Sequence, residues 1–124
     1  MASIIEKETA KASERETIAG VFVRRLQRGM KLQTDPTVIY GMGAAFDGNI
    51  RRSDLKRDTP YNTYVHKGLP PTPIALPGEA SIFAALNPAD GTSLFFVSKG
   101  DGSHAFSDTY EIHLENVRKY QLNQ

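Results

Sequence analysis

Prolines divide this chain of 124 residues into two parts that can fold regularly and one that cannot. Five of the seven prolines lie between positions 60 and 78. Proline fixes φ and lacks the backbone N–H that helices and sheets use, so we expect an extended, ordered loop over 60–78. Helices and strands must then form before and after it. A chain of this length is expected to fold as one domain, 1–124, with its own core.

The part before the loop has the spacing of an amphipathic helix. Apolar residues recur every three or four positions at Ile18, Val21, Phe22 and Leu26. Ser13 with Glu16 three residues later is typical of a capping box at the helix start. Gly29 supplies a C-terminal stop. The sequence therefore predicts a helix that begins near Ser13 and ends before Gly29.

Shorter helices are expected on both sides of the loop. Asp35 can cap a helix with Pro36 in its first position, continuing over 37–42. Residues 53–56 can start another, and residues 81–86 form a third that Asn87–Pro88 closes.

The end of the chain predicts a hairpin followed by a helix. An apolar run over 94–98 reads as a strand, and the glycines at 100–102 form a turn that leads into a second strand over 103–106. Asp108 is expected to cap the last helix, with Glu111 in its third position. The whole pattern indicates an α+β fold, mostly helical, with a small β-hairpin and a long Pro-rich loop.

Composition excludes several classes of function. The net charge is +1, so no strong field attracts nucleic acid or acidic lipid. The chain has no cysteine, and His66, His104 and His113 lack the spacing of metal ligands, so we expect no metal. No apolar run is long enough to cross a membrane, and no signal peptide is present. The polar side of the first long helix carries Arg24, Arg25 and Arg28, which we expect to be solvated. The alternative is that they contact an anionic glycan or peptide.

Two glutamates near the start compete for a chemical role. In MASIIEKETA, Ile4 and Glu8 share one helix face, with Ile5 beside them. A carboxylate on a buried face is unfavourable, and its pKa rises, which suits a general acid. At roughly 100° per residue, Glu6 lies about 200° around the helix from Glu8. The alternative is a solvated helix end with ordinary surface charges.

Longer motifs connect the chain to a known family. They are, in order, LQTDPTVIY from Leu32, YNTY from Tyr61, GLPPTPI from Gly68, SIFAALNP from Ser81, FFV from Phe95 and GDGSHAF from Gly100. In order and spacing they resemble the C-terminal catalytic portion of the endolytic murein transglycosylases, the YceG/MltG-like family. The resemblance covers the chain from Ala2 to about Tyr120.

The resemblance implies a lysozyme-like catalytic domain and a reaction without water or cofactor. Such enzymes cleave the MurNAc–GlcNAc β-1,4 bond and leave 1,6-anhydroMurNAc ends. One carboxyl group serves first as acid and then as base, unlike the two-carboxylate pattern of most glycosidases. The resemblance favours Glu8, because Thr9–Ala10 looks like the pair that follows the catalytic glutamate in related transglycosylases. Glu6 is the alternative acid, or a supporting residue.

Substrate contacts are expected from residues in the same motifs. The candidates are Gln33, Asp35, Tyr40, Tyr61, Asn62, Tyr64 and His104. Amides and hydroxyls beside aromatic rings suit saccharides, and His104 matches a motif position of the family. Asp35 can equally be only a helix cap, Asn62 a structural turn residue and Tyr40 a core aromatic.

Full-length family members carry an N-terminal membrane anchor and a LysM-like domain. The resemblance therefore implies that this chain is a soluble fragment of a protein at the periplasmic face of the bacterial inner membrane. Its expected partners are peptidoglycan glycan strands and the peptidoglycan synthesis machinery, with no nucleic acid. Two rival hypotheses are a non-catalytic peptidoglycan-binding module and an aminodeoxychorismate lyase, a label the family often carries. The lyase would need pyridoxal phosphate on a lysine, and no lysine here has a convincing setting for it.

Overall fold

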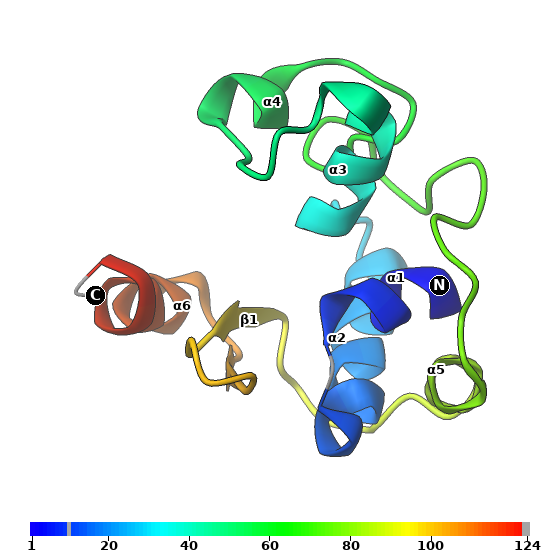
Figure 1. Cartoon of the computed structure of the whole chain (residues 1–124). Coiled ribbons are helices and arrows are strands. Elements are labelled where there is room, and N and C mark those ends of the chain that lie inside the picture. Colours follow the sequence, from blue (N-terminus) through cyan, green and yellow to red (C-terminus); the bar gives the residue numbers. More distant parts are fainter. Residues whose placement is uncertain (10, 123–124) are drawn as a thin grey trace.

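The computed structural model describes residues 1–9 and 11–122. Its elements (Figure 1) are α1 (Ala2–Glu8), η1 (Ala12–Glu14), α2 (Arg15–Gln27), α3 (Asp35–Met42), η2 (Gly43–Ala45), α4 (Arg52–Lys56), α5 (Glu79–Leu86), β1 (Phe95–Ser98), β2 (His104–Ser107), α6 (Tyr110–Val117) and η3 (Arg118–Leu122). η1 and η2 are short 3₁₀ turns, and η3 is π-helical. Several helices with one two-stranded antiparallel sheet confirm the predicted α+β class.

The elements gather around α1 and α2 at the centre of the molecule. α1 packs against α2, α3 and α5, while the sheet and α6 pack against one another. In Figure 1, α3 and α4 form one end of the molecule, and β1 with α6 forms another, with α1 and α2 between them. Across the described ranges, no helix has both the length and the apolar character needed to cross a membrane.

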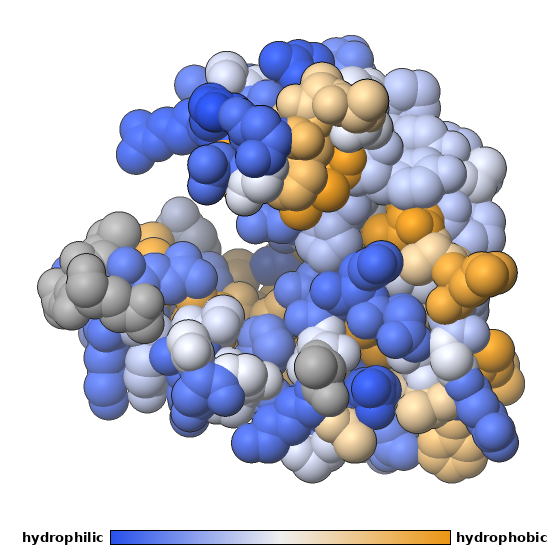
Figure 2. Space-filling model, in the orientation of Figure 1, coloured by the Kyte–Doolittle hydropathy of each residue, from blue (hydrophilic) through white to orange (hydrophobic). Residues whose placement is uncertain are grey.

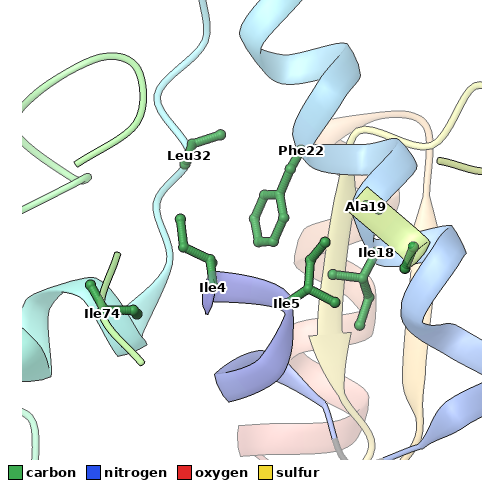
Figure 3. Close-up of a cluster of buried hydrophobic side chains, with 8 residues drawn as sticks. Ile4, Ile5, Ile18, Ala19, Phe22, Leu32 and Ile74 are labelled. Atoms are coloured by element: carbon green, nitrogen blue, oxygen red, sulfur yellow. The ribbon is translucent and has the colours of Figure 1, made fainter. Parts of the chain in front are cut away.

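The hydrophobic core forms where α1 meets α2. Ile4 and Ile5 of α1 and Ile18 of α2 are fully buried, and Phe22 is nearly so. Figure 3 shows these side chains pointing toward one another. The cluster is completed by Ala19, Leu32, Ile74 and Ala84. Burying each large apolar side chain contributes roughly 1.5–3 kcal/mol, so two adjacent isoleucines fix both the position and the rotation of α1.

The first long helix ends as predicted but begins differently. Gly29 has φ 68°, and its N–H donates to Leu26 O while the Met30 N–H donates to Arg25 O. This is a Schellman motif, which favours glycine because the left-handed conformation is strained for other residues. The predicted capping box at Ser13 is wrong. Ser13 lies inside η1, and α2 has no side-chain cap.

Two other predicted caps are wrong by one residue. Asp35 is the first residue of α3, and Thr34 precedes it without a side-chain capping bond. At α6 the cap is Thr109, whose hydroxyl accepts the Ile112 N–H at 3.3 Å. Asp108 instead accepts a hydrogen bond from Thr92 Oγ1 at 2.8 Å. Both errors arise because neighbouring polar residues offer equivalent caps, and tertiary contacts decide between them.

The proline-rich loop and the hairpin agree with the sequence. Residues 57–78 form no helix or strand. The loop is tied to α1 where the Ile74 N–H donates to Ser3 Oγ at 3.1 Å. β1 pairs with β2 in the register Phe96↔Phe106. The limits of both strands lie within one residue of the predicted ones. α5 begins at Glu79, two residues before the predicted start.

Replacing a core isoleucine tests this packing. Ile18→Ala should lower the free energy of unfolding by about 2–5 kcal/mol, because it removes buried methyl groups and leaves a cavity. Ile82→Ala on α5 is the matched control, since Ile82 is 44% exposed and exposed positions usually change stability by less than about 0.5 kcal/mol. Urea unfolding measures both, and equal losses would contradict the assignment of the core.

Candidate functional site

A cavity of about 300 Å³ lies between α3 on one side and the hairpin with α6 on the other. Figure 2 shows the molecule hollowed there, with hydrophilic residues around the opening. Side chains from distant parts of the sequence line it: Glu8, Arg25, Leu32, Gln33, Thr34, Asp35, Tyr64, Phe96, Val97, Ser98, His104, His113, Val117 and Gln121. Five of the eight residues predicted from the sequence to form the site are therefore together: Glu8, Gln33, Asp35, Tyr64 and His104.

Glu8 is the last residue of α1 and faces this cavity. Ile4, one turn before Glu8, and Ile5 are buried and hold the helix in the core. Thr34 Oγ1 donates a hydrogen bond to Glu8 Oε2 at 2.6 Å. Burial raises the pKa of Glu8, and the nearby Asp35 raises it further, while the Thr34 bond and His104 oppose the shift. A carboxyl group in such surroundings holds its proton to higher pH and can act as a general acid.

A buried cluster of three threonines sets the position of Thr34. Thr63 Oγ1 accepts the Thr34 N–H at 3.0 Å, and Thr37 Oγ1 donates to Thr34 O at 2.9 Å. The hydroxyls of Thr37 and Thr63 are also bonded to each other, at 2.9 Å. The cluster holds Thr34 through its backbone, which leaves its hydroxyl free for Glu8. Sequence reasoning missed all three, although they lie inside the LQTDPT and YNTY motifs.

Asp35, Tyr64 and Gln33 form the wall beside Glu8. Tyr64 Oη donates to Asp35 Oδ1 at 2.5 Å. Burial and the Asp35 carboxylate raise the pKa of Tyr64 far above its usual range, so Tyr64 stays protonated as a donor. Gln33 has φ 51°, a left-handed backbone that is strained for a residue with a side chain. Such strain clusters at functional positions, and here it presents the Gln33 side chain to the cavity.

His104 is held on the opposite wall by a carboxylate that the sequence did not suggest. Glu14 Oε1 lies 3.1 Å from His104 Nδ1, and Glu14 Oε2 accepts the His104 N–H at 3.0 Å. Both side chains are nearly buried, at 8% and 13% exposed. This two-point contact fixes the imidazole with its Nδ1 side toward Glu14 and explains why Glu14 does not cap α2. Nothing in local sequence spacing joins residues 90 positions apart.

Arg25 is a further residue of the site whose surroundings the sequence analysis did not predict. It was expected on a solvated helix face, yet it is 7% exposed and lines the cavity. Its Nε donates to Leu94 O at 2.6 Å, and its Nη1 donates to Lys31 O at 2.7 Å. Burial lowers the pKa of Arg25, although arginine remains charged in proteins. Arg24 is also only partly exposed, and donates to Ser93 O at 2.8 Å. The hairpin strand thus rests on charged groups of α2.

Glu6 lies outside the cavity and has a different environment. Its Oε1 accepts the Gly78 N–H at 2.7 Å and the Ser81 hydroxyl at 3.0 Å. These two bonds lower the pKa of Glu6, so it is a carboxylate at neutral pH. Glu6 therefore ties α1 to the start of α5, as expected of a supporting residue.

Three of the predicted substrate-binding residues do not line the cavity. The rings of Tyr40 and Tyr61 are tilted against each other with their centroids 4.8 Å apart. Tyr40 borders a separate hollow with Lys7, Pro36, Ile39 and Ile74. Asn62 is 1% exposed. Its amide donates to Leu55 O at 3.0 Å and Arg57 O at 2.7 Å, and its Oδ1 accepts the Tyr64 N–H at 2.9 Å. The structure corrects the prediction for Asn62: it organises the loop, and its polar atoms are already used.

Within residues 1–9 and 11–122, no group of three or more His, Cys, Asp or Glu side chains is arranged to hold a metal ion. His66 lies at the surface, where Nε2 contacts Asp58 Oδ1 at 2.5 Å. The cavity brings together several side chains that can take part in a reaction. These are an acid with a raised pKa, neighbouring hydroxyl and amide donors, and a cation on the far wall. Ala10, part of the Thr9–Ala10 pair used in the sequence analysis, lies outside the described residues.

Residues 1–119 match the YceG-like family. The chain belongs to this family. It is 44% identical over 120 residues to the endolytic murein transglycosylase of Bacillus subtilis, covering 97% of this chain and 33% of that protein. It is 34% identical over 125 residues to the endolytic murein transglycosylase of Streptococcus pneumoniae D39, covering 97% of this chain and 23% of that one. The chain therefore spans about a third or less of the length of these relatives.

A solved structure agrees with the fold of this YceG-like chain. A crystal structure of a YceG-like protein from Listeria monocytogenes is 44% identical and superposes with a TM-score of 0.84. The match covers 93% of this chain and 36% of that one. The family resemblance read from the motifs is thus confirmed by both sequence and structure.

The opposite pKa shifts of the two glutamates in this YceG-like chain predict opposite effects on stability. Because Glu8 holds its proton more tightly when folded, its favourable contribution is complete at low pH and is lost as pH rises through its folded pKa. Glu6 has a lowered pKa, so its contribution is present at neutral pH and is lost as pH falls through its folded pKa. Glu8→Gln should therefore raise Tm at neutral pH, and Glu6→Gln should lower it.

Thermal melts between about pH 3 and 8 measure both differences, which should shrink as the medium becomes acidic. A Glu8→Gln protein that melts below the native protein at neutral pH would show that Glu8 is not held at an energetic disadvantage.

The Thr34 hydroxyl can be tested separately. Thr34→Val keeps the branched shape and the backbone bonds to Thr63, but removes the donor to Glu8. Because that bond stabilises the carboxylate, its loss should raise the pKa of Glu8 further. NMR titration of the Glu8 side-chain carboxyl carbon measures the shift, with the exposed Thr92→Val as control. An unchanged pKa would mean that the hydrogen bond does not form in solution.

Proposed function

We propose that this chain is the catalytic portion of an endolytic murein transglycosylase. It would cleave the MurNAc–GlcNAc β-1,4 bond inside glycan strands and leave 1,6-anhydroMurNAc ends. The observation that carries the proposal is Glu8, a carboxyl group with a raised pKa that faces an open polar cavity. Relatives that bear the name of this activity support it.

The proposed reaction uses Glu8 twice. The protonated carboxyl group first donates its proton to the glycosidic oxygen, and the bond from that oxygen to C1 of MurNAc breaks. The resulting positive charge is carried by an oxocarbenium-like state or by the N-acetyl group of the sugar. Glu8, now a carboxylate, accepts the proton of the MurNAc 6-hydroxyl while that oxygen bonds to C1. No water is consumed, and Glu8 ends in its starting protonation state.

The Glu8 environment fits both halves of this cycle. Burial favours the neutral acid before the first step. The Thr34 hydroxyl, at 2.6 Å, stabilises the carboxylate that exists between the steps. His104, which also favours the anionic form of Glu8, would assist at the same stage. Burial therefore raises the pKa of Glu8 while Thr34 and His104 lower it, and one carboxyl group can serve as the acid and then as the base.

We further propose that Gln33, Asp35, Tyr64 and His104 contact the sugars. Their amide, carboxylate, phenol and imidazole groups line the same cavity as Glu8 and match the hydroxyls and acetamides of a glycan. Tyr40 and Tyr61 would contact a strand only where it extends beyond the cavity. The proposed substrate is nascent peptidoglycan, handled together with the synthesis machinery at the periplasmic face of the inner membrane.

The proposal predicts different outcomes for two matched variants. Glu8→Gln keeps the size of the side chain but removes its transferable proton. Loss of acid–base catalysis typically reduces rates by about 10²–10⁴ for each role, so this variant should form almost no anhydro ends. Glu6→Gln should retain measurable activity, because Glu6 contacts Gly78 and Ser81 outside the cavity. Mass spectrometry of strands after incubation measures both.

Isotope labelling separates this reaction from hydrolysis. In ¹⁸O-labelled water, the proposed reaction yields anhydro ends without label. Labelled reducing MurNAc ends would show a hydrolase, and the proposal would then be wrong. Equal activity of the two variants would exclude Glu8 as the acid, and binding of strands without any cleavage would indicate a non-catalytic module.

A further inference from the structure

Arg25 is a buried cation that lines the cavity and has no role in the proposed reaction. It belongs to α2 and reaches the cavity from the wall formed with the hairpin. Buried charges are normally paired, because removing a charge from water is unfavourable. Within residues 1–9 and 11–122, no carboxylate forms an ion pair with Arg25. Its neighbours are the oxygens of neutral groups and the ring of Phe95.

The hydrogen bonds of Arg25 leave one edge of the guanidinium open. Nε donates to Leu94 O, and Nη1 donates to Lys31 O and, at 3.4 Å, to Gln33 Oε1. Nη2 has no acceptor in the part of the chain that the structure describes, and it is not fully enclosed by the protein. It therefore keeps a small contact with solvent. The backbone bonds fix the orientation of the group before any ligand arrives.

An aromatic ring and a histidine lie next to the guanidinium in this corner of the cavity. Phe95 lies under the guanidinium at 4.9 Å and stacks on His113 at 5.1 Å, so the two basic side chains share one aromatic support. His113 Nδ1 is buried and has no hydrogen-bond partner among the residues that the structure describes. Burial and the charge of Arg25 both lower the pKa of His113. An anion placed here would meet a fixed cation and a histidine able to donate.

We propose that Arg25 binds a carboxylate of the substrate, which orients the strand over Glu8. Arginine suits this role because its rigid fork of donors matches a carboxylate. In a murein strand the carboxylate comes either from the lactyl group of MurNAc or from the stem peptide. The inference rests on the proposed function for the identity of the ligand. The positive corner itself follows only from the contacts of Arg25.

Binding is measured with the Glu8→Gln protein, so that cleavage does not consume the ligand. The first probe is a peptide-free GlcNAc–MurNAc strand with free lactyl carboxylates, and the second is the same strand with those groups converted to methylamides. If the lactyl group is the ligand, calorimetry should show affinity for the acid roughly 10- to 100-fold higher than for the amide, as expected for a hydrogen bond to a charged group. This comparison needs no change to Arg25.

Two variants then assign the difference to one side chain. Arg25→Gln should bind the acid and the amide equally. Arg24→Lys is the matched control, because Arg24 is the next residue of α2 and also donates to backbone carbonyls, at Ser93 and Ala89. It lines a different hollow, with Gly20 and Pro88, and should keep the full preference for the acid. Circular dichroism shows whether each variant is folded.

A peptide-bearing strand distinguishes the two sources of the carboxylate. If the lactyl group is the ligand, this strand binds as weakly as the amide, since its lactyl groups are already amide-linked. If the stem peptide supplies the ligand, the strand binds tightly until its peptide carboxylates are amidated. Equal affinity for charged and neutral forms in both series would overturn the proposal.

If Glu8→Gln binds strands without discrimination while the native protein makes anhydro ends, only the role of Arg25 is wrong. The absence of both binding and cleavage would count against the proposed function as well.

Discussion

Burial of Ile4 and Ile5 between α2 and α5 is the constraint on which the cavity depends. The two side chains are adjacent and both fully buried, so α1 can neither turn nor slide without exposing one of them. Glu8 lies on the same short helix, and its direction follows from theirs. Ser3 and Glu6 add polar contacts to the proline-rich loop and to α5. The acid is thus positioned by a hydrophobic anchor rather than by the groups that it contacts.

The polar contacts around Glu8 have a different purpose, which is to adjust its protonation. Thr34 and His104 favour the carboxylate, whereas burial and Asp35 favour the acid. Each of the two favourable partners is fixed by a further contact, Thr34 by the threonine cluster and His104 by Glu14. The supporting residues Thr37, Thr63 and Glu14 do not line the cavity. They nevertheless keep two donors from turning away when the charge on Glu8 changes.

Much of the fold could be predicted because it depends on local signals. Apolar spacing gave the phase of α1 and α2, and Gly29 marked a helix end for a conformational reason. Helix starts were harder, because polar residues at the starts of α2 and α3 are bonded to distant partners. Glu14 is bonded to His104, and Thr34 donates its hydroxyl to Glu8. Local rules cannot anticipate a partner that is distant in sequence.

The site shows the same division. Glu8 could be inferred from helix phase, and Gln33, Asp35, Tyr64 and His104 from motifs that resemble a family. Arg25 could not, because its charge suggested a solvated surface and only the hairpin packing buries it. For Asn62 the sequence left open a substrate contact and a structural turn, and its contacts agree with the structural role. Its amide is suited to binding a ligand, but in this loop, which has few regular backbone hydrogen bonds, the amide donates to the carbonyl oxygens of Asp54, Leu55 and Arg57.

The place of Glu8 at the carboxyl end of α1 has a further consequence. Peptide dipoles leave partial negative charge at that end of a helix, which disfavours an anion within the last turn. The pKa of Glu8 therefore depends on whether the last turn of α1 is intact. Unwinding of the last turn would both release Glu8 into water and remove the field that helps it to keep a proton. The proton affinity of Glu8 therefore depends on the local folding of α1. Fraying of the last turn would remove the raised pKa of Glu8 before the molecule as a whole unfolded.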